Sequence, residues 1–366
     1  MPDTQATDMP FTDIIGHTTP IHWLQRAITT HQIGHAYLFV GDPAIGKRST
    51  AIRFIQALSC EQTVPYGVPD SCGTCRACRH ILAEIHPDYL CIRPEHGQSA
   101  TPQIKIEQIR EIEHHVIYRP LSGARKACLI DDADRMTSSA ANALLKTLEE
   151  PPDHSLFVLV TSRPTALPAT IHSRCFRINF SPPPRHTVER YLIDHRHFSR
   201  DDARCISLLT GSRLGEAVQV DLHDLRTKVE SFFAFLTTSA SPSIPAILDQ
   251  AEHLARSYHA QEIIQWLWHG FRDLLILSTG AKSVAVLPQA WLPQLDRLAQ
   301  CLSTDRILVL LDLVHELEQG LQRNTNIQLG LERLFLALHE MLHEPASDSR
   351  TSTYVPSFIT SESAYD

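Results

Sequence analysis

A short apolar run leads directly into a glycine-bounded turn near the start of the chain. Residues 37–40 (YLFV) precede Gly41, and Gly46 and Lys47 follow after four further residues. A strand, such a turn and a helix allow backbone N–H groups to surround a phosphate, while the lysine reaches its outer oxygens. The spacing predicts an α/β fold with a nucleotide-binding loop at Gly41, Gly46 and Lys47. The alternative is a strand-to-helix turn that serves packing alone.

The residue after this lysine departs from the pattern. Arg48 stands where a serine or threonine would offer a hydroxyl to Mg²⁺. A guanidinium has only N–H donors and no acceptor, so it cannot be a metal ligand. Ser49 follows, but one residue along a helix turns the side chain by about 100°, away from the metal. The sequence therefore permits binding of ATP or ADP and argues against metal-assisted hydrolysis.

The second half of such a site is an acidic strand end. Residues 127–130 (ACLI) lead into Asp131 and Asp132. Asp131 is expected on the metal side of the site. Asp132 occupies the place where a glutamate would activate water, and its side chain is one methylene shorter. Arg48 and the short side chain of Asp132 are thus two separate differences from the residues that ATP hydrolysis requires.

Short apolar runs alternate with helix-like segments up to about residue 180. Such alternation is typical of an α/β core whose parallel sheet is covered by helices on both faces. A helix is expected over residues 138–150, because its apolar residues share one face and two prolines follow it. Five parallel strands are expected, at residues 37–40, 88–92, 127–131, 156–161 and 176–180.

Strand character disappears beyond residue 180. Residues 181–184 (SPPP) form a stiff break, and residues 237–242 form a second linker rich in serine and threonine. The helical repeat of residues 305–321 is typical of the segment between the second linker and residue 343. The predicted division is a disordered segment 1–10, an α/β core 11–180, a helical unit 181–236, an all-α domain 244–343 and a disordered tail 346–366.

Bulk properties limit the class of protein. The chain of 366 residues is long enough for two or three domains, and its net charge of −8 gives no global basic field for gripping nucleic acid. No apolar run reaches transmembrane length, and the first ten residues lack the features of a signal peptide. Nine cysteines without a secretory signal indicate a reducing compartment, so we expect a cytoplasmic protein.

Four closely spaced cysteines form the sharpest local signal. Cys60 is followed by Cys72, Cys75 and Cys78, with eleven, two and two residues between them. This spacing suits tetrahedral coordination of a structural zinc ion, and a redox pair or an iron–sulfur cluster is the alternative. His80 and His86 are close enough to be rival ligands but are expected to be ordinary polar residues. The other cysteines are expected to be small buried apolar residues: Cys91, Cys128, Cys175, Cys205 and Cys301.

These pieces together match a known family. The chain resembles the bacterial clamp-loader AAA+ proteins, and within them most closely the delta-prime type of DNA polymerase III subunit. The resemblance covers about residues 11–343. It rests on the four-cysteine insert and on HAYLF (35–39), IKIEQIREI (104–112), LIDDADRMTSSAANALLKTLEEPP (129–152), LPATIHSRC (167–175) and NTNIQLGLERLFLAL (324–338).

The resemblance implies an architecture and a set of partners. It implies an AAA+ core that carries zinc at residues 60–78, a helical lid, and a helical collar that joins five subunits in a ring. The partners would be gamma/tau motor subunits and a delta subunit in a hetero-pentamer. That assembly opens the sliding clamp and places it on primer–template DNA. No membrane is involved.

The resemblance also assigns roles to single residues. Arg174, in the Ser-Arg-Cys motif, looks like an arginine finger that points at the ATP of the neighbouring motor subunit; the alternative is a surface arginine in a salt bridge. A fixed guanidinium would stabilise the charge that spreads over the transferred phosphoryl group. Thr161 corresponds to the first sensor of the family. Gly215, with Arg213 nearby, stands where a motor subunit would place a second sensor arginine.

Two rival functions remain open from the sequence. The first is an active gamma/tau-type motor subunit, which would share the cysteines and the Ser-Arg-Cys motif. Arg48 and Asp132 argue against it, because a motor should have a hydroxyl residue and a glutamate there. The second is a zinc-dependent DNA-binding module, which the mixed charges of residues 70–86 do not favour.

Overall fold

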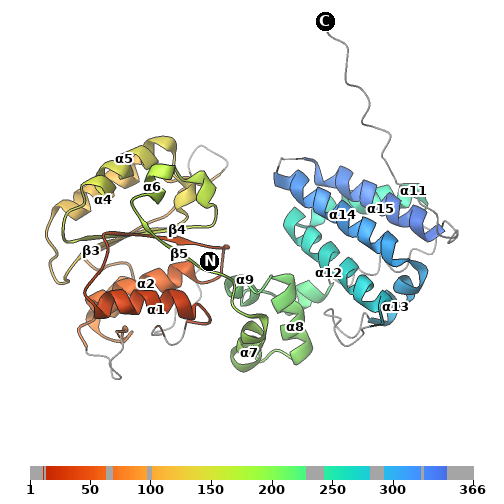
Figure 1. Ribbon diagram of the computed structural model, residues 1–366, viewed down its shortest axis with the longest axis horizontal. Coiled ribbons are helices and arrows are strands. Elements are labelled where there is room, and N and C mark those ends of the chain that lie inside the picture. The colour runs from red at the N-terminus through yellow and green to blue at the C-terminus, as the bar shows by residue number, and fades with distance from the viewer. Residues whose placement is uncertain are drawn as a thin grey trace, which may run out of the picture. The chain divides into compact units, whose positions relative to one another are not determined.

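The computed structural model describes residues 11, 14–62, 69–96, 101–227, 243–280, 292–322 and 325–343. The chain divides into two compact units, residues 1–226 and 227–366 (Figure 1). The predicted core lies in the first unit and the predicted all-α domain in the second. The finer three-part division stays a prediction. The predicted linker 237–242, the segment 1–10 and the tail 346–366 lie outside the described residues.

The first unit contains a five-stranded parallel sheet in the order β2-β3-β4-β1-β5. The predicted α/β class and all five strands are confirmed, with ends that differ by at most one residue. The strands are β1 (Ala36–Val40), β2 (Tyr89–Ile92), β3 (Lys126–Ile130), β4 (Ser155–Thr161) and β5 (Phe176–Asn179).

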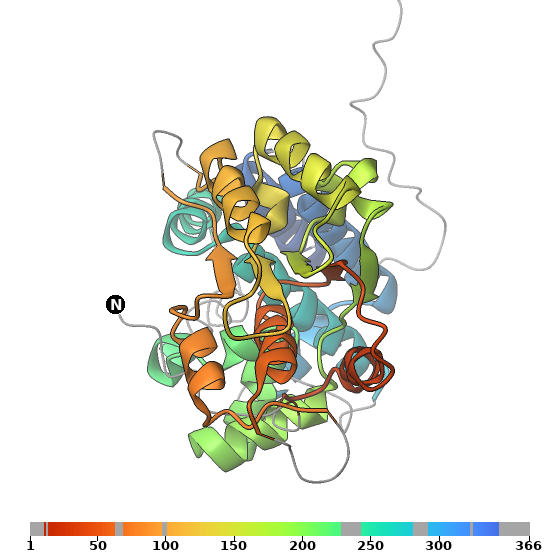
Figure 2. The same cartoon turned by 90° about the vertical axis from the view of Figure 1, so that its left-hand side faces the viewer.

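Helices cover both faces of this sheet, as the apolar strands require. Figure 1 shows α1 (Thr18–Thr29) and α2 (Lys47–Ser59) on one face, with α4, α5 and α6 on the other, and Figure 2 shows the same layers from the side. The remaining elements of this part are α3 (Arg76–Leu82), α4 (Ile106–Ile117), α5 (Ser138–Glu149), α6 (Ala169–His172) and the 3-10 turns η2 (Ala133–Arg135) and η3 (Pro164–Ala166).

The two apolar cores follow from the alternation of side chains along each strand. In β1, Leu38 and Val40 belong to the core beneath α4 and α5, whereas Tyr37 and Phe39 belong to the core beneath α1 and α2. Helix α5 begins after Thr137, whose hydroxyl accepts a hydrogen bond from the Ala140 N–H. The predicted apolar face of this helix is confirmed: Ala141, Leu144 and Leu148 are buried, and Leu145 lies at its margin.

Three helices follow the sheet within the first unit. They are α7 (Arg185–Arg196), α8 (Arg200–Leu209) and α9 (Leu214–Ala217). Their own small core contains Val188, Leu192, Ala203, Ile206 and Ala217. Residues 185–217 therefore pack around a small core of their own, and the predicted helical unit 181–236 as a whole stays a prediction.

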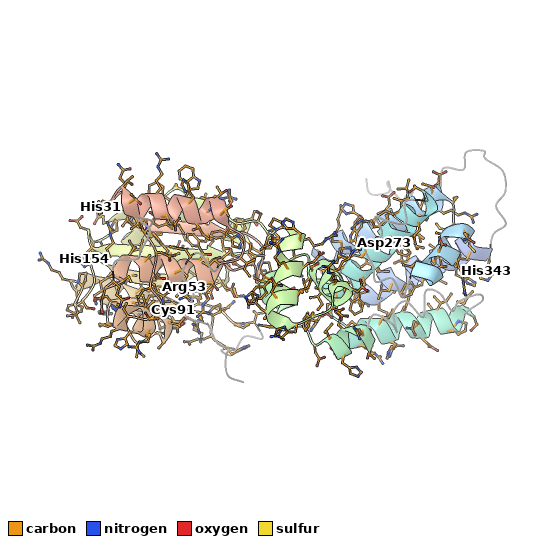
Figure 3. The ribbon with its side chains drawn as sticks, turned by 90° about the horizontal axis from the view of Figure 1, so that it is seen from below. His31, Arg53, Cys91, His154, Asp273 and His343 are labelled. Atoms are coloured by element: carbon orange, nitrogen blue, oxygen red, sulfur yellow. The ribbon has the colours of Figure 1, made fainter. Side chains whose placement is uncertain are left out.

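The second unit contains only helices among its described residues. These are α11 (Ile244–Ser257), α12 (Ala260–Ser278), α13 (Leu292–Cys301), α14 (Thr304–Gln322) and α15 (Ile327–His343). The predicted helix 305–321 is confirmed as α14. Asp273 of α12, labelled in Figure 3, is fully buried in this unit. In the part of the chain that the structure describes, no helix is long and apolar enough to span a bilayer.

Candidate functional site

The glycine-bounded turn forms a tight loop between β1 and α2. Gly46, at the N-cap of α2, has a φ of 105°, which favours glycine. The side chain of Lys47 is nearly buried, and its Nζ donates to the Gly41 carbonyl at 2.6 Å and to the Asp42 carbonyl. Burial lowers the pKa of Lys47, and the nearby carboxylates of Asp132 and Asp131 offset part of that shift. The lysine therefore closes the loop from inside.

Arg48 lies beside Asp131, the carboxylate predicted for the metal side of the site. Its Nε lies 3.3 Å from Asp131 Oδ2, as an ion pair rather than an aligned hydrogen bond. Its terminal nitrogen donates to Glu84 Oε1 at 2.9 Å, and Glu84 also pairs with Arg93. Burial raises the pKa of Asp131, and the charge of Arg48 counters part of that rise. The carboxylate expected to bind Mg²⁺ is thus neutralised by a side chain of the same chain.

Of the other predicted polar residues, Asp132 and Thr161 are held by protein contacts. Ser49 is exposed, which agrees with its predicted rotation away from the metal side. Asp132 has a half-exposed side chain whose Oδ2 lies 3.7 Å from Arg135 Nε. Thr161, the predicted sensor, is fully buried, and its hydroxyl donates to Asp134 Oδ1 at 2.8 Å.

Asp134 organises the end of β4 and was not predicted. Its carboxylate accepts from Thr161 Oγ1, from the Ser162 N–H at 3.3 Å and from Arg163 Nε at 3.0 Å. Burial alone would raise the pKa of Asp134, but the hydrogen bonds from Thr161 and Arg163 lower it. The signal in the sequence was a third acidic residue in the run Asp-Asp-Ala-Asp after β3.

Two further contacts, also not predicted, hold the outer carbonyls of the loop. The Gly215 N–H donates to the Ala44 carbonyl at 2.8 Å, so α9 is attached to the loop. A Cβ at position 215 would lie 2.8 Å from that same oxygen, which explains why glycine is required there. The nearby Arg213 pairs with Glu216 at 2.8 Å. His17 is buried, and its Nε2 lies 2.5 Å from the Ile45 carbonyl oxygen.

Arg174 lies on the surface after α6 and just before β5. One terminal nitrogen pairs with Glu149 Oε1 at 2.6 Å, and the other donates to the Thr170 carbonyl at 3.0 Å and to Ser173 Oγ at 3.2 Å. Its side chain is 31% exposed, so part of the guanidinium is open to solvent. The residue lines a surface hollow of about 620 Å³ that includes His35 and Phe176.

The register of the sheet separates Arg174 from the loop of its own chain. Strands β1 and β5 are parallel, with Tyr37 opposite Phe176 and Val40 opposite Asn179. The loop follows the carboxyl end of β1, whereas Arg174 precedes the amino end of β5. The four residue-to-residue steps of extended chain from Tyr37 to Gly41 span about 13 Å. Arg174 therefore lies at the opposite end of the sheet from Lys47.

The four predicted cysteines come together beside α3. Their sulfur atoms all lie within 4.8 Å of one another, and this is the cluster among the described residues that could hold a metal ion. Backbone N–H groups point at the sulfurs: Cys72 N–H at Cys60, Cys75 N–H at Cys72 and Cys78 N–H at Cys75, at 3.2–3.4 Å. Burial favours a higher pKa for Cys72, but the hydrogen bonds from Cys75 and Thr74 lower it to about 6.

This donor set fits a tetrahedral thiolate-binding metal. Four thiolates leave no open coordination position, and the N–H groups partly offset their negative charge. His80 and His86 are not part of the cluster, as predicted. The prediction that the other cysteines are buried is wrong for Cys301, which is exposed at the end of α13, and Cys91 is only half-buried. An apolar neighbourhood in sequence did not determine which face of the helix Cys301 would occupy.

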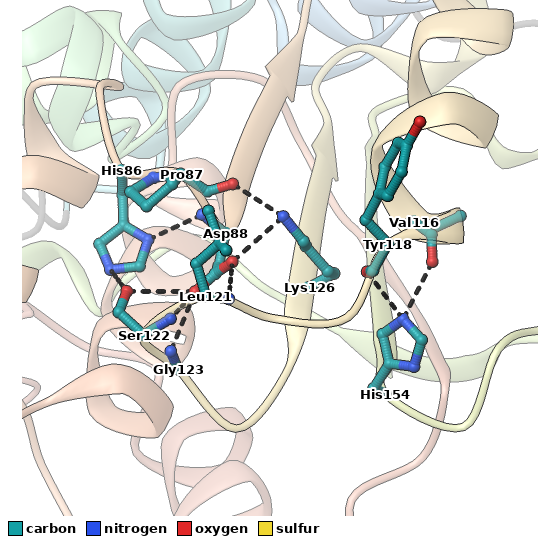
Figure 4. Close-up of polar contacts among 10 residues, drawn as sticks. All are labelled: His86, Pro87, Asp88, Val116, Tyr118, Leu121, Ser122, Gly123, Lys126 and His154. Carbon is teal, nitrogen blue, oxygen red and sulfur yellow. Dashed lines mark hydrogen bonds and ion pairs between the residues drawn. The ribbon is translucent and has the colours of Figure 1, made fainter.

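A buried ion pair joins the start of β3 to the residue before the edge strand β2 (Figure 4). Lys126 Nζ lies 3.1 Å from Asp88 Oδ1, and both side chains are almost completely buried. The Asp88 carboxylate also accepts from the N–H groups of Leu121, Ser122 and Gly123 at 2.8–2.9 Å. Although burial alone would raise the pKa of Asp88, these N–H donors hold it well below its usual range.

Replacing Asp88 by asparagine should lower the free energy of unfolding by about 3–5 kcal/mol, because Lys126 is left buried without its counter-charge. A carboxylate with a depressed pKa stabilises the fold fully above its unfolded value near 4, and this stabilisation is lost as the pH falls further. Urea unfolding at pH 7 and at pH 3.5 measures both effects. Asp153→Asn, at an exposed position, is the control and should change neither. Equal stability of the Asp88 and Asp153 variants at pH 7 would contradict the expectation.

Comparison with known proteins identifies the family. Residues 16–184 match a family model described as "DNA polymerase III, delta subunit", and residues 227–340 match "DNA polymerase III, delta subunit, C terminal". The chain is 30% identical over 325 residues to DNA polymerase III subunit delta' of Bacillus subtilis, an alignment that covers 87% of this chain and 94% of that relative. It is 31% identical over 314 residues to subunit delta' of Escherichia coli, covering 84% and 90%.

A second class of relatives is also similar. The chain is 26% identical over 367 residues to DNA polymerase III subunit tau of Bacillus subtilis, covering 92% of this chain and 63% of tau. The alignments with the two delta' relatives cover 94% and 90% of their own length, against 63% for this tau subunit. The chain belongs to the delta-prime family of DNA polymerase III subunits.

Proposed function

We propose that this chain works in the clamp loader of DNA polymerase III as a subunit that lends an arginine to its neighbour and hydrolyses no ATP itself. Its partners are gamma/tau motor subunits and a delta subunit in a hetero-pentamer. That assembly loads the sliding clamp onto primed DNA in the cytoplasm. The proposal is supported by the relatives, which are delta' and tau subunits of DNA polymerase III.

The position of Arg174 is the observation that carries the arginine role. The guanidinium is partly exposed at one end of the sheet, and the phosphate-binding loop of the same chain follows the other end. A phosphoryl group that meets Arg174 must therefore be bound by another subunit. An arginine in such a position stabilises the charge of phosphoryl transfer by in-trans contact.

The contacts of Arg48 support the absence of hydrolysis. Catalysis would need Asp131 to share a magnesium ion and a glutamate-length base to orient water. Instead, Asp131 pairs with Arg48, and Asp132 is short and lies beside Arg135. The loop keeps the N-terminal N–H groups of α2, so ATP or ADP could still bind through its phosphates at Gly41, Gly46 and Lys47.

We further propose that the cluster of Cys60, Cys72, Cys75 and Cys78 binds one zinc ion. Zinc takes four thiolates in a closed structural site, and the ion would fix the loop before α3 without taking part in ATP chemistry. The expected cytoplasmic location agrees with this, since thiols stay reduced there.

The isolated chain should release no phosphate from ATP above the rate of its Lys47→Ala variant. The Arg48→Thr variant should be equally inactive, because Asp132 would still be too short to act as the base. A steady-state phosphate-release assay with Mg²⁺ measures this. Turnover that Lys47→Ala abolishes would favour the rival function of an active motor subunit.

Membership of the clamp loader is tested by reconstitution. The chain is expected to co-purify in a defined complex with motor and delta subunits of the same organism. That complex should load the clamp onto primed DNA, and omission of this chain should abolish loading. A complex that loads clamps equally well without this chain would contradict the proposal.

A further inference from the structure

The guanidinium of Arg174 is held from two elements of its own chain. Glu149, the last residue of α5, pairs with one terminal nitrogen at 2.6 Å. Thr170 of α6 and the adjacent Ser173 accept from the other nitrogen at 3.0 Å and 3.2 Å. A guanidinium has five N–H donors, so these three contacts leave donors for a further anion.

Helix stability does not explain a carboxylate at position 149. The last turn of a helix carries partial negative charge, which disfavours an acidic side chain there. Glu149 is also half-exposed, so a surface ion pair with Arg174 adds little to the stability of the fold. The contact instead orders a long side chain that would otherwise sample many rotamers.

We propose that Glu149 is the positioning residue for Arg174. It fixes the guanidinium at the rim of the surface hollow, where the open N–H groups can meet the transferred phosphoryl group of the neighbouring subunit. This inference rests on the proposed function of Arg174. Glu149 does not touch the nucleotide; it acts by removing rotamer freedom from the arginine before the transition state forms.

The next residue provides a matched control. Glu150 lines the same hollow, and none of the described contacts of Arg174 involves it. It carries the same charge as Glu149. If negative charge near the phosphates affected the rate in general, replacing either residue would change it. If Glu149 positions Arg174, only its replacement should change the rate.

The experiment measures the DNA-stimulated ATPase of the reconstituted clamp loader. Glu149→Ala should lower kcat at the receiving site roughly tenfold with an unchanged KM for ATP, since a loosened catalytic group costs rate and not nucleotide affinity. Glu149→Gln should keep most of the rate, because its amide oxygen can still accept from Arg174. Glu150→Ala should match the unmodified complex. In an Arg174→Ala background, Glu149→Ala should cause no further loss.

The outcomes separate this inference from the function on which it rests. If Arg174→Ala leaves the rate unchanged, the proposed function fails, and the inference fails with it. If Arg174→Ala slows the complex but Glu149→Ala leaves its rate unchanged or raises it, only the inference is overturned. Equal losses from Glu149→Ala and Glu150→Ala, or a further loss in the Arg174→Ala background, would also overturn it. If the alanine variant does not assemble, a large loss of rate in an assembled Glu149→Gln complex would still overturn the inference.

Discussion

Replacing Arg174 by alanine should slow ATP hydrolysis at the neighbouring motor site by about 10³- to 10⁵-fold, the range in which arginine fingers act. The loss arises because the charge of the transferred phosphoryl group is left without its guanidinium. Assembly should be unaffected, since the Arg174 side chain holds an exposed ion pair and two surface hydrogen bonds within its own chain. The DNA-stimulated ATPase activity of the reconstituted complex measures the effect. Because the assay sums over all motor sites, the total rate should fall by the contribution of the affected site.

Two variants sharpen this test. Arg174→Lys should rescue little, because an ammonium cannot reproduce the planar, multiply donating contact of a guanidinium. Arg177 is an exposed arginine of the neighbouring strand β5, and its Nε donates to Asn179 Oδ1. The Arg177→Ala variant is the control and should leave the rate unchanged. An Arg174→Ala complex with full ATPase activity would reduce this arginine to a surface ion-pair partner of Glu149.

Removing the proposed zinc ion from the four-cysteine cluster should destabilise the fold. Structural zinc contributes about 10–16 kcal/mol in small peptides. The sheet of the first unit has two apolar cores that do not depend on the cysteines. We therefore expect the free energy of unfolding to fall by less than in peptides, but by at least about 3 kcal/mol. Cys78→Ser leaves three thiolates around a fully buried position and should lower the melting temperature and expose the chain near α3 to protease.

Metal content and a control complete this second test. The purified chain should contain about one zinc per molecule by elemental analysis, and a strong chelator should reproduce the Cys78→Ser phenotype. Cys301→Ser changes an exposed cysteine of α13 and should alter neither zinc content nor melting temperature. Full stability of a zinc-free chain would show that the thiol cluster folds without metal.

The sequence predicted the architecture because its strongest signals are local. The five strands are short apolar runs bounded by turns, and each was found within two residues of its predicted ends. The buried face of α5 follows from a repeat near 3.6 residues, which any helix of that sequence must express. The cysteine cluster was predictable because its four ligands lie within nineteen residues of one another, so that one loop and one short helix bring them together.

The roles of the site residues depended on partners far away in the sequence. The sequence showed that Arg48 could not bind a metal, but not that it would neutralise Asp131, 83 positions later. The family resemblance predicts a sensor at Thr161, whereas its hydroxyl donates to Asp134 because η2 packs against β4. Gly215 was aligned with a missing sensor, yet its backbone holds the loop at Ala44.

The sequence by itself determined the elements, their faces and the thiolate set, because period and spacing act over a few residues. Only the tertiary structure decided the order and register of the strands. Parallel pairing of β1 with β5 separates Arg174 from Lys47, and the end of α5 brings Glu149 to the guanidinium. Register and crossover contacts of this kind are set by packing between distant segments, and no local pattern specifies them.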